Sequence, residues 1–199
     1  MNIFNNNMDY ERFQKLLFIV NSEIRNTKPS DIIKSPNPVW RNKRDETLVE
    51  IGAYCLMPNH FHLLIRVKNA NSTSKFIQRL QLGYSKYFNI KNDRTGILFQ
   101  GKCKSRHIEN NNYLKYIFSY IHLNPIKLIQ KDWKEKGIKN FKKAKNFLKS
   151  YKYSSYLDFI EDRGATKILE KSEFPDYFSR SNLFNKEIFE WLKYKKHEN

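Results

Sequence analysis

The stretch of residues 47–67, TLVEIGAYCLMPNHFHLLIRV, decides the fold of this chain. Residues 47–57 form a β-branched and apolar run of strand length, and residues 60–67 form a second one. The Pro58-Asn59 pair between these two runs is typical of a turn. This stretch therefore predicts a β-hairpin in which the second strand begins with the sequence His-Phe-His.

Helices are predicted on either side of the hairpin in the sequence. Residues 9–25 and residues 72–89 place apolar side chains at helical spacing. Segment 26–44, which contains several prolines, is expected to lack regular structure. Residues 97–107 are a third strand candidate, and the helix that follows them is expected to stop near Pro125.

The predicted order is helix, strand, strand, helix, strand, helix, which indicates an α+β fold. A ferredoxin-like antiparallel sheet with helices on one face has this order but begins with a strand. Only residues 1–7 precede the first helix, so either a short strand lies there or this first strand is missing from the chain as given. We expect a core domain over residues 1–130 and a basic, helical C-terminal extension over residues 131–199 that packs on it.

The charge of the chain indicates a polyanionic partner. The sequence has 37 Lys+Arg against 20 Asp+Glu, a formal net charge of +17 and a pI of about 9.8. Charge alone does not choose among DNA, RNA and an anionic membrane, but 12 Tyr, 15 Phe and 3 Trp supply rings on which unpaired bases can stack. Most of these rings are nevertheless expected in the core.

Neither a membrane span nor a secretion signal is predicted. No apolar stretch approaches the roughly 18 residues that a spanning helix needs, and no signal peptide opens the chain, so we expect a cytoplasmic protein without a membrane partner. Cys55 and Cys103 have no CxxC spacing, which argues against a disulfide framework or a cysteine zinc site. We expect both thiols to be buried.

Two histidines begin the second strand of the hairpin. Strand alternation sends the imidazoles of His60 and His62 to one face and Phe61 to the other. This arrangement is typical of metal ligands, although such a pair also fits two solvated or hydrogen-bonded histidines.

The helix that ends near Pro125 carries a stripe at helical spacing, most of which is expected to be core. Its members are Tyr113, Tyr116, Ile117, Tyr120, Ile121 and Asn124. Asn124 follows Tyr120 by four residues, so that a phenol and an amide oxygen can approach one site together.

Three motifs, in this order, resemble those of a known family. They are LMPNHFHLL at 56–64, GILFQGK at 96–102 and YIHLNP at 120–125, and YSSY at 153–156 resembles a further segment. The family is that of the REP-associated tyrosine transposases, which are single-tyrosine HUH transposases of the insertion-sequence 200-like kind. The resemblance covers about residues 9–130.

This resemblance implies an enzyme that cuts and rejoins single-stranded or hairpin DNA, such as repetitive palindromes, through a 5′-phosphotyrosine intermediate. It implies that His60 and His62 hold a divalent metal and that Tyr120 is the nucleophile. Asn124 occupies the position where relatives place a polar third ligand, often Gln. Imidazole combined with oxygen ligands suits Mg²⁺ or Mn²⁺. Relatives include both dimers and monomers, so both states remain open.

Tyr113 and Tyr116 compete with Tyr120 for the role of nucleophile, but neither has the Ile-x-x-Asn-Pro sequence that follows Tyr120. Basic side chains that alternate along the third strand candidate are predicted to line the DNA groove; they are Lys102, Lys104 and Arg106.

Two alternatives to the enzyme are considered. Family members generally open with a strand and an Arg-Gly turn, which this sequence lacks, so an inactive or domesticated DNA-binding protein is the first alternative. A small-molecule metal hydrolase shares the His-x-His pattern, but it lacks further His or Asp ligands and does not explain the charge.

Overall fold

The computed structural model of the chain describes residues 1–22, 33, 39–42, 46–161, 167–175, 184 and 187–190. The longer elements are α1 (Asn7–Ile19), β1 (Val49–Met57), β2 (His60–Val67), α3 (Ser72–Lys91) and α4 (Asn111–Leu123). The shorter helices are α5 (Trp133–Lys136), α6 (Phe141–Ser150), α7 (Tyr156–Ile160), η1 (Val39–Arg41), η2 (Asn124–Leu128) and η3 (Lys171–Glu173). The predicted α+β class is confirmed, and most of segment 26–44 lies outside the described residues.

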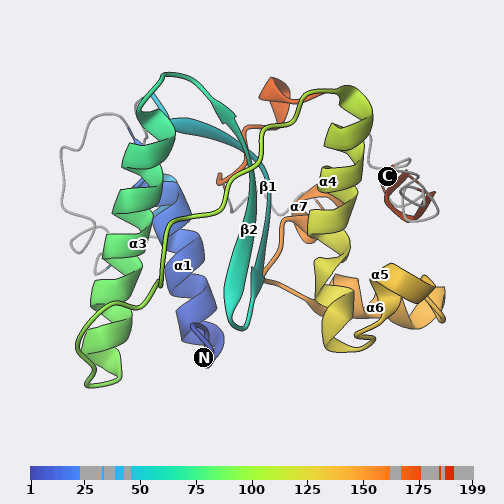
Figure 1. The fold of residues 1–199 in the computed structure, drawn as a ribbon, viewed down its shortest axis with the longest axis horizontal. Helices are drawn as coiled ribbons and strands as arrows, with labels where there is room; N and C mark the ends of the chain where they lie inside the picture. The colour runs from blue at the N-terminus through green and yellow to red at the C-terminus, as the bar shows by residue number, and fades with distance from the viewer. Residues whose placement is uncertain are drawn as a thin grey trace.

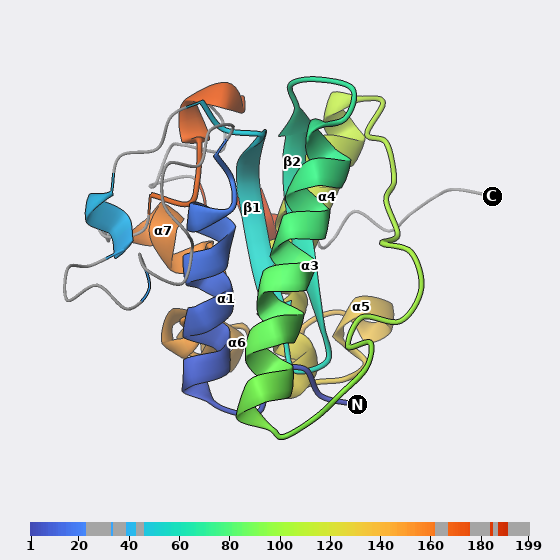
Figure 2. The same cartoon turned by 90° about the vertical axis from the view of Figure 1, so that its left-hand side faces the viewer.

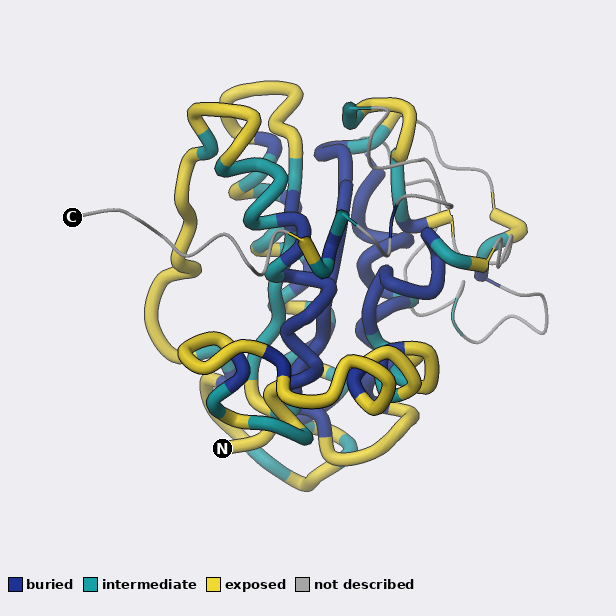
Figure 3. The backbone as a smooth tube through the Cα atoms, turned by 90° about the vertical axis from the view of Figure 1, so that its right-hand side faces the viewer, coloured by how far each residue is buried: buried dark blue, intermediate teal, exposed yellow. Residues whose placement is uncertain are grey.

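β1 and β2 form the predicted hairpin, which lies at the centre of the molecule (Figure 1). The strands are antiparallel, with Met57 opposite His60 and Cys55 opposite His62. β1 is buried along its whole length, whereas most of β2 is half-buried or exposed (Figure 3). The register shifts between Ile51 and Ala53, which places Gly52 at a bulge.

Helices cover both faces of this sheet, so the prediction of helices on one face is wrong. α1 and α3 lie on one face, and α4 and α7 lie on the other (Figures 1 and 2). The reason is that both faces of the hairpin are apolar. Tyr54 and Leu56 belong to a core shared with α1 and α3, whereas Cys55 and Met57 belong to a second core shared with α4.

The third strand candidate does not form a strand. In the described part of the chain, the sheet consists of β1 and β2, and the segment from α3 to α4 is irregular. Leu98 and Phe99 pack against the first core, but residues 100–107, which we call the basic segment, are all exposed (Figure 3). These residues are mostly polar or charged, so they have little apolar surface with which to fix a register on a sheet.

Residues 1–6 also contain no strand. The backbone amides of Ile3 and Phe4 both donate to the carbonyl of Pro58, at 2.8 and 3.0 Å, and so hold this segment at the turn of the hairpin. The ferredoxin-like sheet of four strands is therefore not found among the described residues.

Residues beyond 130 complete the second core. Trp133, Leu148 and Tyr156 are buried in it together with residues of β1 and α4. Residues 153–155 also run along β1, where the amide of Leu56 donates to the carbonyl of Tyr153 at 2.9 Å. The exposed surface of α6 is rich in lysine, with Lys142, Lys143, Lys145 and Lys149 all exposed.

Two smaller expectations can be compared with the structure. Cys55 is buried as predicted, but Cys103 is exposed because it lies in the basic segment, away from either core. None of the described helices is both long enough and apolar enough to cross a bilayer.

Candidate active site

The two histidines of β2 meet at the turn end of the hairpin. Their Nε2 atoms lie 3.1 Å apart. The Nδ1 atom of His60 lies 2.7 Å from Oδ1 of Asn59, so a proton on Nδ1 is bonded there and leaves the Nε2 lone pair of His60 available. The expectation from strand alternation, that both rings share one face, is confirmed by this contact.

The surroundings of the pair keep both rings neutral at neutral pH. Burial lowers the pKa of His62 to about 4, and the pKa is lowered further because a proton on His62 would be repelled by any proton on His60 and by the charge of Lys127. Burial and Lys127 also lower the pKa of His60. Neutral imidazoles have the lone pairs that a metal ion requires.

The distances and donors fit a divalent ion. Two nitrogens that each bind one ion at about 2.1 Å, with an angle near 95° between the bonds, lie about 3.1 Å apart. Among the described residues, no group of three or more His, Cys, Asp or Glu side chains is placed to hold a metal. A further ligand from this described part of the chain would therefore be a neutral oxygen.

Asn124 offers such an oxygen. It is 2% exposed, and its Oδ1 atom is buried with no hydrogen-bond partner among the described residues. A buried acceptor without a partner is costly and is often explained by an ion or a water molecule. Asn124 follows the last turn of α4, which reaches the same end of the molecule as the hairpin turn (Figure 1).

α4 brings Tyr120 to the histidine pair. The ring of Tyr120 packs edge to face against His62, with centroids 5.6 Å apart and planes at 81°. The ring of Trp133 also lies near it, with centroids 6.2 Å apart and planes at 28°, and the Nζ atom of Lys134 lies 5.2 Å from the centroid of the Tyr120 ring. The phenol ring therefore lies beside His62 and Lys134, while Lys127 places positive charge near both histidines.

The helix that carries Tyr120 is fixed at both ends by its sequence. The side chain of Asn110 caps its start by accepting from the amide of Tyr113 at 2.8 Å, and Pro125 prevents its continuation. The stop near Pro125 that the sequence predicts is confirmed, since α4 ends at Leu123.

The basic residues that were expected on a strand lie in an irregular segment instead. Lys102, Lys104 and Arg106 lie in the exposed basic segment and not on a regular strand. Among the residues that the structure describes, Arg106 has a ring contact, with its guanidinium carbon 4.8 Å from the ring centroid of Tyr113. The structure thus brings together His60, His62 and Tyr120, whereas Lys102 and Lys104 remain exposed.

A histidine that sequence reasoning did not single out holds α4 in place. The Nδ1 of His122 donates to the carbonyl of Phe118 at 2.8 Å, so its Nε2 accepts from the hydroxyl of Ser155 at 2.8 Å. That hydroxyl in turn accepts from the amide of Tyr54 at 2.9 Å. Burial lowers the pKa of His122 to about 3. The sequence did contain a signal for this pair, because His122 lies in the motif YIHLNP and Ser155 lies in the motif YSSY.

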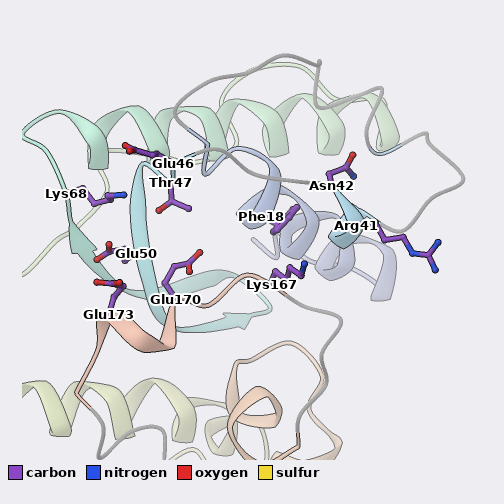
Figure 4. Close-up of a pocket in the computed structure, with 10 residues that line it drawn as sticks. All are labelled: Phe18, Arg41, Asn42, Glu46, Thr47, Glu50, Lys68, Lys167, Glu170 and Glu173. Atoms are coloured by element: carbon purple, nitrogen blue, oxygen red, sulfur yellow. The ribbon is translucent and has the colours of Figure 1, made fainter.

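An open cavity of about 550 Å³ lies elsewhere, and its lining includes Phe18, Glu46, Glu50, Lys68, Glu170 and Glu173 (Figure 4). None of the candidate site residues lines it. Arg66 forms ion pairs with both Glu50 and Glu173, so its single positive charge is shared between two carboxylates of the lining.

Comparison with known proteins gives one family match. A family model described as "Transposase IS200 like" matches residues 16–124, which is more than half of the chain. The matched span includes the hairpin, α3 and α4 and ends at Asn124. Neither the curated proteins nor the solved structures contain a match.

Proposed function

The chain belongs to the family of IS200-like transposases, and from that membership we propose that it cuts and rejoins single-stranded DNA through a covalent bond to Tyr120. Membership by itself indicates a DNA-binding and DNA-processing protein. The observation that carries the finer proposal is the contact of the Tyr120 ring with His62, whose Nε2 lies 3.1 Å from that of His60.

In the proposed step, the phenolic oxygen of Tyr120 attacks the phosphorus of one phosphodiester. The bond from phosphorus to the 3′ oxygen breaks, and the proton of the phenol passes through water to that departing oxygen. The products are a free 3′-hydroxyl and a 5′ phosphate joined to Tyr120. Attack by another 3′-hydroxyl reverses the step and rejoins DNA, so no nucleotide cofactor is consumed.

His60, His62 and Asn124 would hold Mg²⁺ or Mn²⁺, which when bound supplies charge neutralisation to the phosphate oxygens. The other residues of the site attract and orient the substrate. Lys127 and Lys134 place positive charge around the histidine pair and the phenol, where the phosphate has to lie. Trp133 and His62 both have ring contacts with Tyr120, which limit the orientations of its ring.

The proposed substrate is a hairpin with unpaired flanks, like the repetitive palindromes that the resemblance implies. Unpaired strands suit the combination of positive charge and exposed rings better than a blunt duplex does. A DNA-binding protein without cleavage activity is the alternative, and the following experiment separates the two.

Hairpin oligonucleotides with randomised single-stranded flanks are incubated with the protein and Mg²⁺ or Mn²⁺, then run on a denaturing gel. Because a 5′ phosphate is joined to the tyrosine, a label at the 3′ end of the DNA should stay with the protein, and a 5′ label should be released. Tyr120→Phe should abolish this adduct, and peptide mapping should place the link on Tyr120.

The matched control is Tyr153→Phe, because Tyr153 stacks on Tyr10, in the first core and away from the histidine pair. It should form the adduct as the wild type does. An adduct that persists in Tyr120→Phe would move the nucleophile to Tyr116, and a wild type that forms none would leave the DNA-binding alternative.

A further inference from the structure

Three tyrosines on α4 form a row that leads to the candidate nucleophile. Tyr113 and Tyr116 have centroids 6.2 Å apart, Tyr116 and Tyr120 have centroids 6.3 Å apart, and each pair of planes is within 20° of parallel. The spacing of three and four residues places these rings on one side of the helix. All three side chains are half-buried, so part of each ring reaches the surface.

The first two rings of this row lie off the buried face of α4. That face carries Phe118, Ile121 and His122, which are buried. Tyr120 packs against the second core, and among the described residues Tyr113 and Tyr116 are not counted with either core. These two rings are half-buried, so each stays partly accessible beside the packed face of the helix.

Positive charge lies along the same row. Arg106 is placed over Tyr113 at 4.8 Å, and Lys134 is placed over Tyr120 at 5.2 Å. Arg106 also connects the row to the basic segment, in which Lys102 and Lys104 are exposed. Parallel rings beside cationic side chains are the features that bind single strands, since rings stack on bases and cations pair with phosphates.

We propose that Tyr113 and Tyr116 form a stacking track for the unpaired nucleotides next to the scissile phosphate, and that Arg106 binds the backbone of that strand. The ring centroids of Tyr113 and Tyr116 lie 6.2 Å apart, close to twice the spacing of about 3.4 Å between stacked bases. The two rings can therefore each stack on a different base of one strand. The track would set which phosphate reaches Tyr120. Only this last role rests on the proposed function, because binding by the track does not require cleavage.

The test measures binding of a fluorescent single-stranded DNA oligonucleotide by anisotropy, without metal, over a range of salt concentrations. Tyr113→Ala and Tyr116→Ala should each weaken binding by about 5- to 100-fold, with an unchanged dependence on salt. Tyr113→Phe and Tyr116→Phe keep the rings and should bind as the wild type does. Arg106→Gln should lower the slope of log K against log salt by about 0.7, because it removes one phosphate contact.

A fluorescent base analogue, placed at one position of the strand after another, then shows which base stacks on which tyrosine ring. Quenching by stacking should be lost at one position in Tyr113→Ala and at a different position, nearer the bond that is cut, in Tyr116→Ala. The control is Phe141→Ala on α6, because Phe141 is also an exposed ring, at 49%, but lies outside the row. It should change neither affinity nor quenching.

The outcomes separate the track from the proposed function. Alanine variants that bind as the wild type does would overturn the track, even if the Tyr120 adduct forms. Loss of binding in these variants would support the track, even if no adduct ever forms. If circular dichroism shows that an alanine variant has lost helix, Tyr→Leu at the same position keeps apolar volume without a ring, and wild-type binding by that variant would also overturn the track.

Discussion

The histidine pair and His122 show two uses of a neutral imidazole in one small region. The Nε2 atoms of His60 and His62 lie against each other, 3.1 Å apart, so one ion could replace this single contact and bind both rings. The fully buried His122 instead bonds through Nδ1 to the Phe118 carbonyl and through Nε2 to the Ser155 hydroxyl, so it could bind an ion only by breaking a buried hydrogen bond to the fold. This difference separates a candidate ligand pair from a structural histidine within the same protein.

His60→Ala or His62→Ala should weaken Mn²⁺ binding by about 10- to 100-fold or more and should abolish formation of the DNA adduct, because few protein ligands are available. Isothermal titration calorimetry measures the first effect, and a denaturing gel measures the second. His107→Ala is the control, since His107 is exposed in the basic segment and should not affect metal affinity. Unchanged affinity in both site variants would exclude the pair as ligands.

The pKa of about 3 for His122 predicts a loss of stability in mild acid. Above pH 6.5 the ring is neutral in both states. Below pH 6.5 the unfolded chain takes up a proton that the folded protein cannot, so stability falls as pH falls toward 3, by at most about 1.4 kcal/mol per pH unit. His62, with a folded pKa of about 4, should add a similar loss.

Urea denaturation at pH 7 and pH 5.5 measures this effect, and His122→Gln supplies the comparison. The variant should be less stable at pH 7, because it loses the fit of the buried ring. However, the drop in unfolding free energy from pH 7 to pH 5.5 should be about 1.4 kcal/mol smaller in the variant than in the wild type. An identical pH dependence in the two proteins would show that another group titrates.

At the scale of the element, α4 illustrates what local signals predict and what they do not. Its stop near Pro125 was evident from residue types alone. The inward face was not, because Phe118 and His122 are buried while Tyr113 remains half-exposed. Two overlapping apolar stripes fit the same helical period, and the choice between them depends on partners in β1 and α7 that are distant in sequence.

The bulge in β1 gives a prediction about one glycine. A Cβ atom on Gly52 would lie 2.5 to 2.8 Å from three ring atoms of Phe174, which follows η3. Gly52→Ala should therefore displace that ring and lower stability by about 1 to 3 kcal/mol, as measured by chemical denaturation. The double variant Gly52→Ala with Phe174→Ala should lose less than the sum of the two single variants. Strict additivity would mean that the two residues do not touch.

At the scale of the whole molecule, the charge and the core follow from different parts of the sequence. The hairpin supplies apolar residues to both of its faces, which is why helices pack on each side of it. The positive charge is carried by exposed surfaces such as the basic segment and α6. The composition gives the net charge, and the spacing of apolar residues predicted most of the helices. The packing of helices on both faces of the two strands could not be predicted in this way, because it depends on contacts between segments that are distant in sequence.

The net charge of +17 predicts strongly salt-dependent DNA binding. Affinity for a hairpin with single-stranded flanks should fall about a thousandfold between 50 and 200 mM salt if six or more phosphates are contacted. It should also exceed the affinity for a blunt duplex at every salt concentration. Anisotropy titrations with both DNAs check this, and equal affinities would indicate a general polyanion binder.

Sequence reasoning reached the parts of the site that lie in single motifs and missed those that join distant segments. His60, His62 and Tyr120 were proposed from two short motifs, and their rings do lie together. Trp133 and Lys134 were missed, because nothing in their local sequence reveals that the chain turns back to Tyr120 after η2. The strand expected at 97–107 failed because alternating charges resemble a strand even where no partner strand is available.

The position of Trp133 has a consequence for how this protein could diversify. The span shared with the family ends at Asn124, yet two of the side chains around the Tyr120 ring, Trp133 and Lys134, come after it. Recombination between relatives at that junction would transfer the histidines and the tyrosine intact while replacing part of the wall around the phenol. Recombinants made in this way would keep one set of motif residues and differ in the side chains that contact the ring of the same tyrosine.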